Sequence, residues 1–113
     1  MSHDKDVTVS FDAVAIEQWR ILPLTVTLRH SGIVKFHRDP KDAAWSFLRI
    51  IDVPTDWPQS VSDDGGTLKL HDTLKPATGE FKYRIEVVAE DVVYTSPTYA
   101  IGETDPPIII NEV

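Results

Sequence analysis

Apolar side chains recur at every second position through most of this chain. The clearest case is FKYRIEVV at 81–88, in which four apolar residues, from Phe81 to Val87, alternate with lysine, arginine and glutamate. Successive side chains of a strand point to opposite faces, so a period of two gives each segment one face to bury. No helical periodicity extends beyond about two turns, and the best helical candidate is DAVAIEQW at 12–19. The chain is therefore expected to be all-β.

Turn signals divide the alternating segments into seven or eight short strands. Glycine, proline and aspartate gather in the runs HSG, DPKD and SDDGG, and AED reverses the chain between two apolar segments. The segment AWSFLRIIDV is apolar on both faces, which is typical of a central strand. The expected strands cover 7–12, 22–29, 33–38, 44–53, 67–70, 81–88, 92–101 and 108–111.

A length of 113 residues suits one domain, so 1–113 is expected to form a single antiparallel β-sandwich. Within it, LHDTLKPATGEFKYRIEVVAED at 70–91 resembles the loop and following strand of fibronectin type III and immunoglobulin-like domains. In those domains an L-x-P-x-T-x-Y pattern leads into a core strand. The resemblance implies an immunoglobulin-like sandwich and says nothing about activity. The expected core includes Phe11, Val26, Leu28, Phe36, Phe47, Tyr83, Ile85 and Val87.

The charge and the missing cysteines exclude several classes of function. A net charge of −7 would repel phosphate backbones and anionic lipid, so neither nucleic acid nor a membrane is an expected partner. The absence of cysteine removes disulfides, zinc–thiolate sites and blue-copper ligation. It also favours a reducing compartment, and the N-terminal MSHDKDVTV has no apolar leader segment. A cytoplasmic location is therefore expected.

The scattered polar and aromatic residues do not form a recognisable metal, cofactor or sugar site. Four histidines lie far apart in the sequence, and the acidic loop residues lack the alternating spacing of calcium ligands. The glycine pair at 65–66 is followed by neither lysine nor a helix, so it is a turn and not a phosphate loop. Neither a metal nor a cofactor is expected. Trp19, Trp45 and Trp57 could form a carbohydrate platform, but burial in the core is the favoured interpretation.

One dipeptide, Asp105-Pro106, carries distinctive chemistry. The aspartate carboxylate can reach its own carbonyl carbon through a five-membered ring, and the proline nitrogen leaves more easily when protonated than an ordinary peptide nitrogen. Proximity is built into the residue, so much of the entropic barrier is already absent. Pro106 also restricts Asp105 to extended conformations, and neither it nor Pro107 can donate a backbone hydrogen bond. A simpler interpretation remains open, in which the two prolines end a strand and turn a corner.

Several features together resemble the DP-EP (Asp-Pro endopeptidase) family of bacterial self-cleaving, self-assembling β-sandwich proteins. These are the length, the cysteine-free strand pattern, LKPATGEFKYRIEVV, and the run DPPIIIN after SPTYAIGETD. The resemblance implies an endopeptidase that hydrolyses its own Asp105-Pro106 bond, with the fragments remaining assembled. The alternative is a non-enzymatic immunoglobulin-like interaction module whose last strand mediates assembly.

No sequence motif identifies the proton donor for such a cleavage. The candidates are Glu103, Tyr99, Glu86 and His71, and Glu103 is included in the expected catalytic set with Asp105 and Pro106. The second Asp-Pro bond, Asp39-Pro40, is a competing site, although a cut there would divide the core.

The strand that follows the proposed cut is expected to remain attached. Ile108 and Ile110 share one face of the strand and are expected to be its two buried anchors, with Ile109 on the other face. The strand is surplus to a seven-strand sandwich, so it is expected to pair with the edge of a neighbouring copy. The expected partner is therefore the protein itself, as a homo-oligomer.

Overall fold

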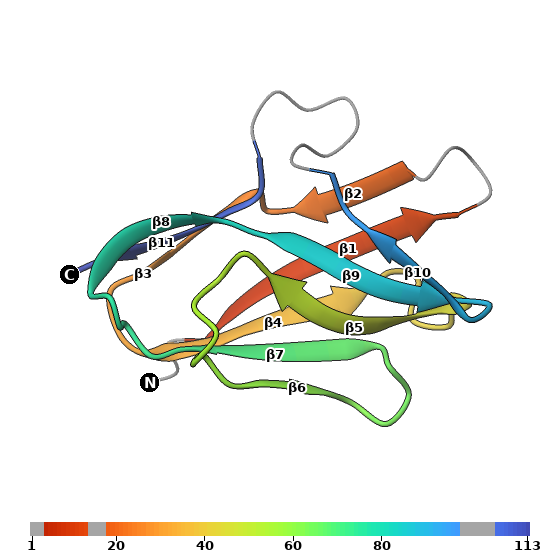
Figure 1. Ribbon diagram of the computed structural model, residues 1–113, viewed down its shortest axis with the longest axis horizontal. Helices are drawn as coiled ribbons and strands as arrows, with labels where there is room; N and C mark the ends of the chain where they lie inside the picture. The colour runs from red at the N-terminus through yellow and green to blue at the C-terminus, as the bar shows by residue number, and fades with distance from the viewer. Residues whose placement is uncertain (1–3, 14–17, 98–105) are drawn as a thin grey trace.

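The computed structural model describes residues 4–13, 18–97 and 106–113, and these residues form an all-β fold without helix (Figure 1). Eleven strands lie within them. The strands are β1 (Lys5–Asp12), β2 (Gln18–Leu22), β3 (Thr25–Leu28), β4 (Gly32–Arg38), β5 (Trp45–Ile51), β6 (Gln59–Val61), β7 (Thr67–Asp72), β8 (Thr78–Lys82), β9 (Arg84–Ala89), β10 (Val92–Thr95) and β11 (Ile108–Glu112).

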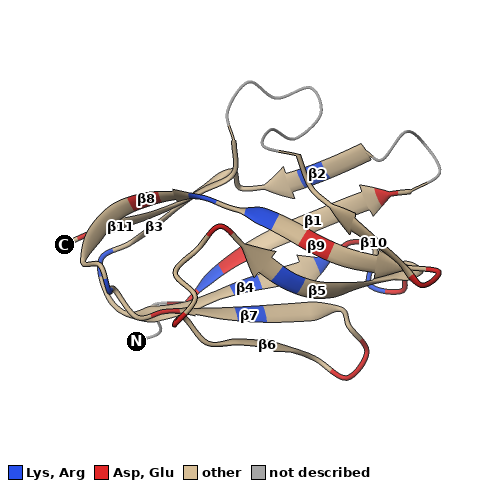
Figure 2. Ribbon diagram, viewed as in Figure 1, with Lys and Arg blue, Asp and Glu red and all other residues tan. Residues whose placement is uncertain are grey.

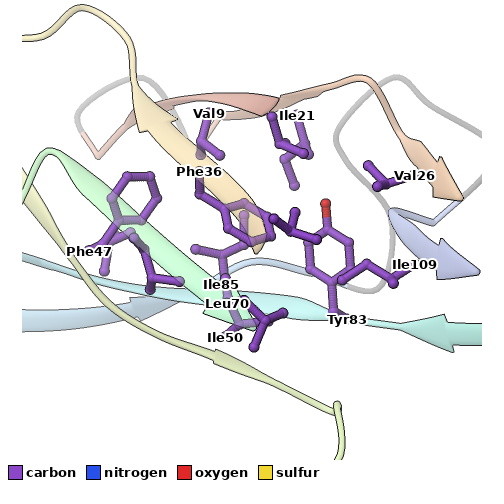
Figure 3. Close-up of a cluster of buried hydrophobic side chains, with 14 of the residues drawn as sticks. Val9, Ile21, Val26, Phe36, Phe47, Ile50, Leu70, Tyr83, Ile85 and Ile109 are labelled. Carbon is purple, nitrogen blue, oxygen red and sulfur yellow. The ribbon is translucent and has the colours of Figure 1, made fainter. Parts of the chain in front are cut away.

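The strands assemble into one five-stranded and two three-stranded sheets. The five-stranded sheet has the order β2-β1-β4-β7-β6, and the smaller sheets have the orders β10-β9-β5 and β3-β11-β8. Figure 1 shows β9 and β5 crossing in front of β1 and β4. The buried side chains between them come from all three sheets, including Phe36, Ile85 and Ile109 (Figure 3). The arrangement is compatible with a β-sandwich.

The expectation of purely antiparallel pairing is wrong. β1 pairs with β4 in parallel, and β11 pairs with β3 in parallel, whereas the other pairs are antiparallel. The reason lies in the path of the chain. Between β1 and β4 it forms β2 and then leaves for another sheet as β3, so β4 returns beside β1 through a crossover rather than a hairpin.

Two of the predicted strands are each divided between two sheets. The run 22–29 breaks at Pro23, so that Leu22 belongs to β2 and Thr25–Leu28 form β3. The run 81–88 breaks at Tyr83, so that β8 pairs with β11 while β9 pairs with β5 and β10. Across Tyr83 the alternation of burial keeps its phase, because both sheets bury side chains in the same core. Across Pro23 the buried face shifts by one residue: Ile21 is buried, Leu22 is 48% exposed, and Val26 is the next buried residue. The period of two therefore does not reveal where the chain changes sheet.

The strand β5 was expected to be central, but it lies at the edge of its sheet. Its pairing with β9 shifts in register between Phe47 and Arg49, and the inward position then falls on Ile50. A bulge of this kind changes the phase of the alternation. This change of phase explains why the segment looks apolar on both faces, although β5 pairs with a neighbouring strand along one edge only.

Three further segments can be compared with the elements expected from the sequence. The edge strand β6 lies between the expected strands 44–53 and 67–70, where no strand was expected, and its three residues are exposed. The helical candidate at 12–19 begins on the last residue of β1 and ends within β2, and 14–17 lies outside the described residues. The reversal at AED is confirmed: Glu90 and Asp91 have φ angles of 50° and 63° and join β9 to β10.

The predicted core is confirmed residue by residue. All eight expected residues are buried, and Phe36, Ile85 and Val87 are completely inaccessible. The three tryptophans are also buried, with exposed fractions between 2% and 4%. A carbohydrate platform needs exposed rings, so the interpretation of the tryptophans as core residues is confirmed. Trp57 packs its ring edge against Phe81 and donates from Nε1 to the Lys75 carbonyl at 3.2 Å.

Candidate functional site at the C-terminal strand

The described chain resumes at Pro106, and from Pro107 onward its backbone is hydrogen-bonded to other strands or turns of the same chain. Pro106 is half-buried and Pro107 is buried. The Tyr83 amide donates to the Pro107 carbonyl at 3.3 Å, and the Ile108 amide donates to the Leu24 carbonyl at 2.7 Å. Asp105, Glu103 and Tyr99 lie outside the described residues. The structure therefore defines only the C-terminal side of the Asp105-Pro106 bond.

The strand β11 lies between two other strands of its own chain. It runs parallel to β3, where Ile109 pairs with Val26, and antiparallel to β8, where Ile109 pairs with Phe81. Figure 1 shows the strand enclosed between these two neighbours. Both edges of β11 are thus occupied by strands of its own chain, so the expectation that this strand is surplus is wrong. Pairing with a neighbouring copy stays a prediction.

The inward face of β11 carries different residues from those expected. Pro107, Ile109 and Asn111 are buried, whereas Ile108 and Ile110 are half-buried on the other face. Paired residues of neighbouring strands share a face, and Ile109 lies opposite the buried Val26. The anchor of this strand is therefore Ile109, whose side chain lies beside Tyr83 in Figure 3.

Tyr83 connects the core to the C-terminal strand. It lies between β8 and β9, where the chain passes from one sheet to the next, and its backbone holds Pro107. The ring packs edge-on against Phe36 with centroids 5.5 Å apart. Its hydroxyl is buried and has no hydrogen-bond partner among the described residues. Desolvation raises the pKa of Tyr83 above its usual value.

A polar cluster holds the other end of β11. The Asn111 side chain is 2% exposed and donates from Nδ2 to the Pro76 carbonyl at 2.8 Å. It also lies against Asp72, the last residue of β7. Asp72 Oδ1 accepts a hydrogen bond from the Leu74 amide at 2.9 Å, which supports the positive φ of 57° at Leu74. Neither Asp72 nor Asn111 was expected at this site from the sequence.

The described proton-donor candidates are engaged elsewhere. The Glu86 carboxylate pairs with Arg49 at 2.7 Å across β9 and β5, where Figure 2 shows charges of both signs. His71 belongs to the five-stranded sheet, and its Nε2 lies 3.1 Å from Ser31 Oγ. The contacts that hold Pro107 and Ile108 instead come from Tyr83 and Leu24.

The second Asp-Pro bond lies in a closed turn after β4. The Asp39 amide donates to the Val9 carbonyl at 2.9 Å, and Ser10 Oγ donates to Asp39 Oδ2 at 3.3 Å. On the other side, the Ala43 amide donates to the Pro40 carbonyl at 3.1 Å. The carboxylate and both flanking backbones are thus fixed, so Asp39-Pro40 serves as an internal reference for the reactivity of an Asp-Pro bond.

Within the described ranges, no three histidine, aspartate or glutamate side chains gather as metal ligands would. His37, for example, pairs through Nε2 with Asp6 Oδ1 at 2.8 Å. The same ranges include no helix with the length and apolar character needed to cross a membrane.

Comparison with known proteins assigns no family to the chain. No family model matches it, and a search of curated proteins finds no match. The resemblance to the Asp-Pro endopeptidase family therefore stays a prediction from the sequence.

Proposed function

We propose that this protein cleaves its own chain at Asp105-Pro106 and retains the C-terminal strand after the cut. The proposal rests on the chemistry of the Asp-Pro bond and on the family resemblance of the sequence. It is supported by one structural observation: the chain immediately after the bond is held by its own fold, from Pro107 through both edges of β11. The Pro106 side of the bond therefore adjoins a segment with a defined position.

The proposed reaction has two steps. A carboxylate oxygen of Asp105 attacks the carbonyl carbon of the same residue, and the bond from that carbon to the Pro106 nitrogen breaks as the nitrogen takes up a proton. The product is a cyclic anhydride and a free secondary amine on Pro106. Water then opens the anhydride and leaves Asp105 as the new C-terminus. Neither step needs an oxidant or a reductant, and water is the only other nucleophile.

The position of β11 favours retention of the cut piece. Burying the Ile109 side chain contributes roughly 1.5–3 kcal/mol, and each backbone hydrogen bond of the two ladders adds about 0.5–1.5 kcal/mol. Immobilising a free peptide costs an estimated 4–15 kcal/mol. Because β11 is hydrogen-bonded on both sides, it can leave only by breaking both ladders, which makes its dissociation slow.

The proposal is tested by intact-mass measurements on freshly purified and aged protein. We expect 106–113 to separate in mass under denaturing conditions, with the cut at Asp105-Pro106 only. Asp105→Ala should abolish the cut, while Asp39→Ala should leave it unchanged. Glu103→Gln should slow the reaction less than Asp105→Ala. Equal cutting at both Asp-Pro bonds, or cutting that continues in denaturant, would identify ordinary chemical lability and end the proposal.

The alternative of an interaction module is favoured by a separate observation. Val92 and Val93 of β10 are 49% and 52% exposed, and β10 lies at the end of the order β10-β9-β5. An apolar strand without charged residues at a sheet edge can pair with a second copy of the same strand. A dimer that Val93→Lys converts to a monomer, in protein that never cleaves, would favour this alternative.

A further inference from the structure

Strands β3 and β8 are joined to each other through β11. Their sheet has the order β3-β11-β8, and within the described ranges neither outer strand pairs with any other strand. The sheet therefore brings together two distant parts of the chain over its C-terminal segment, as Figure 1 shows. Removing β11 would leave a row of unpaired backbone N–H and C=O groups on each side of its place. We call this place between the two strands the β3–β8 slot.

The β3–β8 slot buries every second residue of the strand that fills it. Ile109 is completely buried, and it lies opposite Val26 of β3 on one side and Phe81 of β8 on the other. Ile108 and Ile110 point to the other face of the strand and are half-buried. The central inward position therefore contributes more to recognition than its two neighbours.

The next inward position is occupied by Asn111, which makes a specific hydrogen bond. Its side chain is 2% exposed and donates from Nδ2 to the Pro76 carbonyl at 2.8 Å. The residue opposite Asn111 on β8 is Gly79, which has no side chain to fill the space beside the amide. An apolar side chain at this position would remove the donor to Pro76. The position therefore favours an amide over an apolar residue.

Backbone contacts at the beginning of the strand determine its direction. The Pro107 carbonyl accepts a hydrogen bond from the Tyr83 amide at 3.3 Å, and the Ile108 amide donates to the Leu24 carbonyl at 2.7 Å. Leu24 directly precedes β3, and Tyr83 directly follows β8. The two ladders are thus extended by one residue each, parallel to β3 and antiparallel to β8.

We propose that the β3–β8 slot is a peptide-binding site, and that its ligand from outside the chain is the C-terminal strand of a second copy. The ligand is an extended peptide with proline, an apolar residue and asparagine at alternate positions, as at Pro107, Ile109 and Asn111. The strand of a second copy has this pattern by identity and can form the same contacts. In the uncut chain the covalent tether gives the chain's own strand a high effective concentration, which excludes other peptides. Exchange between copies rests on the proposed cleavage, which removes the tether, whereas the binding site does not.

The site is tested in a chain that cannot be cut. In the Asp105→Ala protein, adding Ile109→Ala weakens the chain's own strand and leaves β3 and β8 unchanged. Fluorescently labelled PPIIINEV is titrated into both proteins, and binding is followed by anisotropy. We expect the peptide to bind the Ile109→Ala protein at least about thirtyfold more tightly than the Asp105→Ala protein. The peptide should also raise the Tm of the Ile109→Ala protein. Absence of both effects would overturn the site.

Variants of the peptide test the register of binding to the Ile109→Ala protein. Ile109→Ala in the peptide should weaken binding by about thirtyfold or more, and Ile110→Ala by less than about tenfold. Asn111→Ala in the peptide should weaken binding by about tenfold, through loss of the hydrogen bond to Pro76. A peptide with the same residues in reverse order serves as the control. Equal losses at 109 and 110, or binding of the reversed peptide, would overturn the site.

Exchange between copies is tested with protein that has been cut. Uniformly ¹⁵N-labelled and unlabelled samples are mixed and followed by native mass spectrometry. We expect complexes that combine a labelled 1–105 with an unlabelled 106–113 to accumulate with time, and none to form from the Asp105→Ala protein. Cut protein that never exchanges its strand would overturn the second copy as ligand. Protein that fails to cleave would end the proposed function, and the peptide titrations would still decide the binding site.

Discussion

Truncating Ile109 tests which face of β11 is the anchored one. The Ile109 side chain is completely buried between Val26 of β3 and the core, whereas Ile110 is half-buried on the opposite face. Replacing a buried isoleucine by alanine costs about 2–5 kcal/mol through lost transfer energy and the cavity that remains. We therefore expect Ile109→Ala to lower the free energy of unfolding by roughly 3 kcal/mol, and Ile110→Ala to lower it by about 1 kcal/mol.

The measurement is urea denaturation in the Asp105→Ala background, so that both variants are compared as uncut chains. The slope of the transition should be unchanged, because the surface exposed on unfolding is almost the same. An Ile110→Ala variant as destabilised as Ile109→Ala would refute the inward assignment. It would restore the sequence-based expectation that Ile108 and Ile110 are the anchors.

Three further predictions concern single positions. Asp72→Asn should raise the free energy of unfolding by about 1 kcal/mol or more at neutral pH, because the amide is uncharged in its buried position and keeps the acceptor for Leu74. Since folding raises the pKa of Asp72, the gain should shrink as the pH falls. Thermal unfolding at pH 4 and pH 7 measures this. Tyr83→Phe should be neutral or stabilising by about 1 kcal/mol, because the buried Tyr83 hydroxyl has no hydrogen-bond partner among the described residues. A fall of more than about 1 kcal/mol in the free energy of unfolding, measured by urea denaturation, would show that the hydroxyl is hydrogen-bonded. Gly65→Ala should destabilise by about 1–3 kcal/mol, since φ is +73° and the added Cβ would lie 2.4 Å from Ser46 Cβ; Gly66→Ala, whose nearest contact is 3.2 Å, should cost less in the same assay.

The alternation of the sequence predicted the core well, because burial on one face of a strand is a local property of the chain. Phe36, Ile85 and Val87 are inaccessible as expected. The changes of sheet at Pro23 and Tyr83 were not predictable in this way, since a strand that passes from one sheet to another keeps the same period. The parallel pairing of β1 with β4 likewise depends on the path of the intervening chain through a second sheet.

The candidate site was predictable only where it depends on covalent chemistry. The dipeptide Asp105-Pro106 is visible in the sequence, and a strand follows it at Ile108–Glu112, one residue longer than the expected 108–111. The inward face of that strand is determined by its register with Val26, which local pattern does not contain. The contact between Asp72 and Asn111 joins residues far apart in the chain, and the only local signal was a polar residue directly after an isoleucine run.

The central claim is that the fold retains the strand released by its own cleavage, and mass spectrometry of a single aged sample tests it most directly. Under native conditions we expect one species, heavier than the uncut chain by one water. Under denaturing conditions the same sample should separate into fragments 1–105 and 106–113. An aged sample that remains uncut, or a native species that already lacks 106–113, would contradict the account.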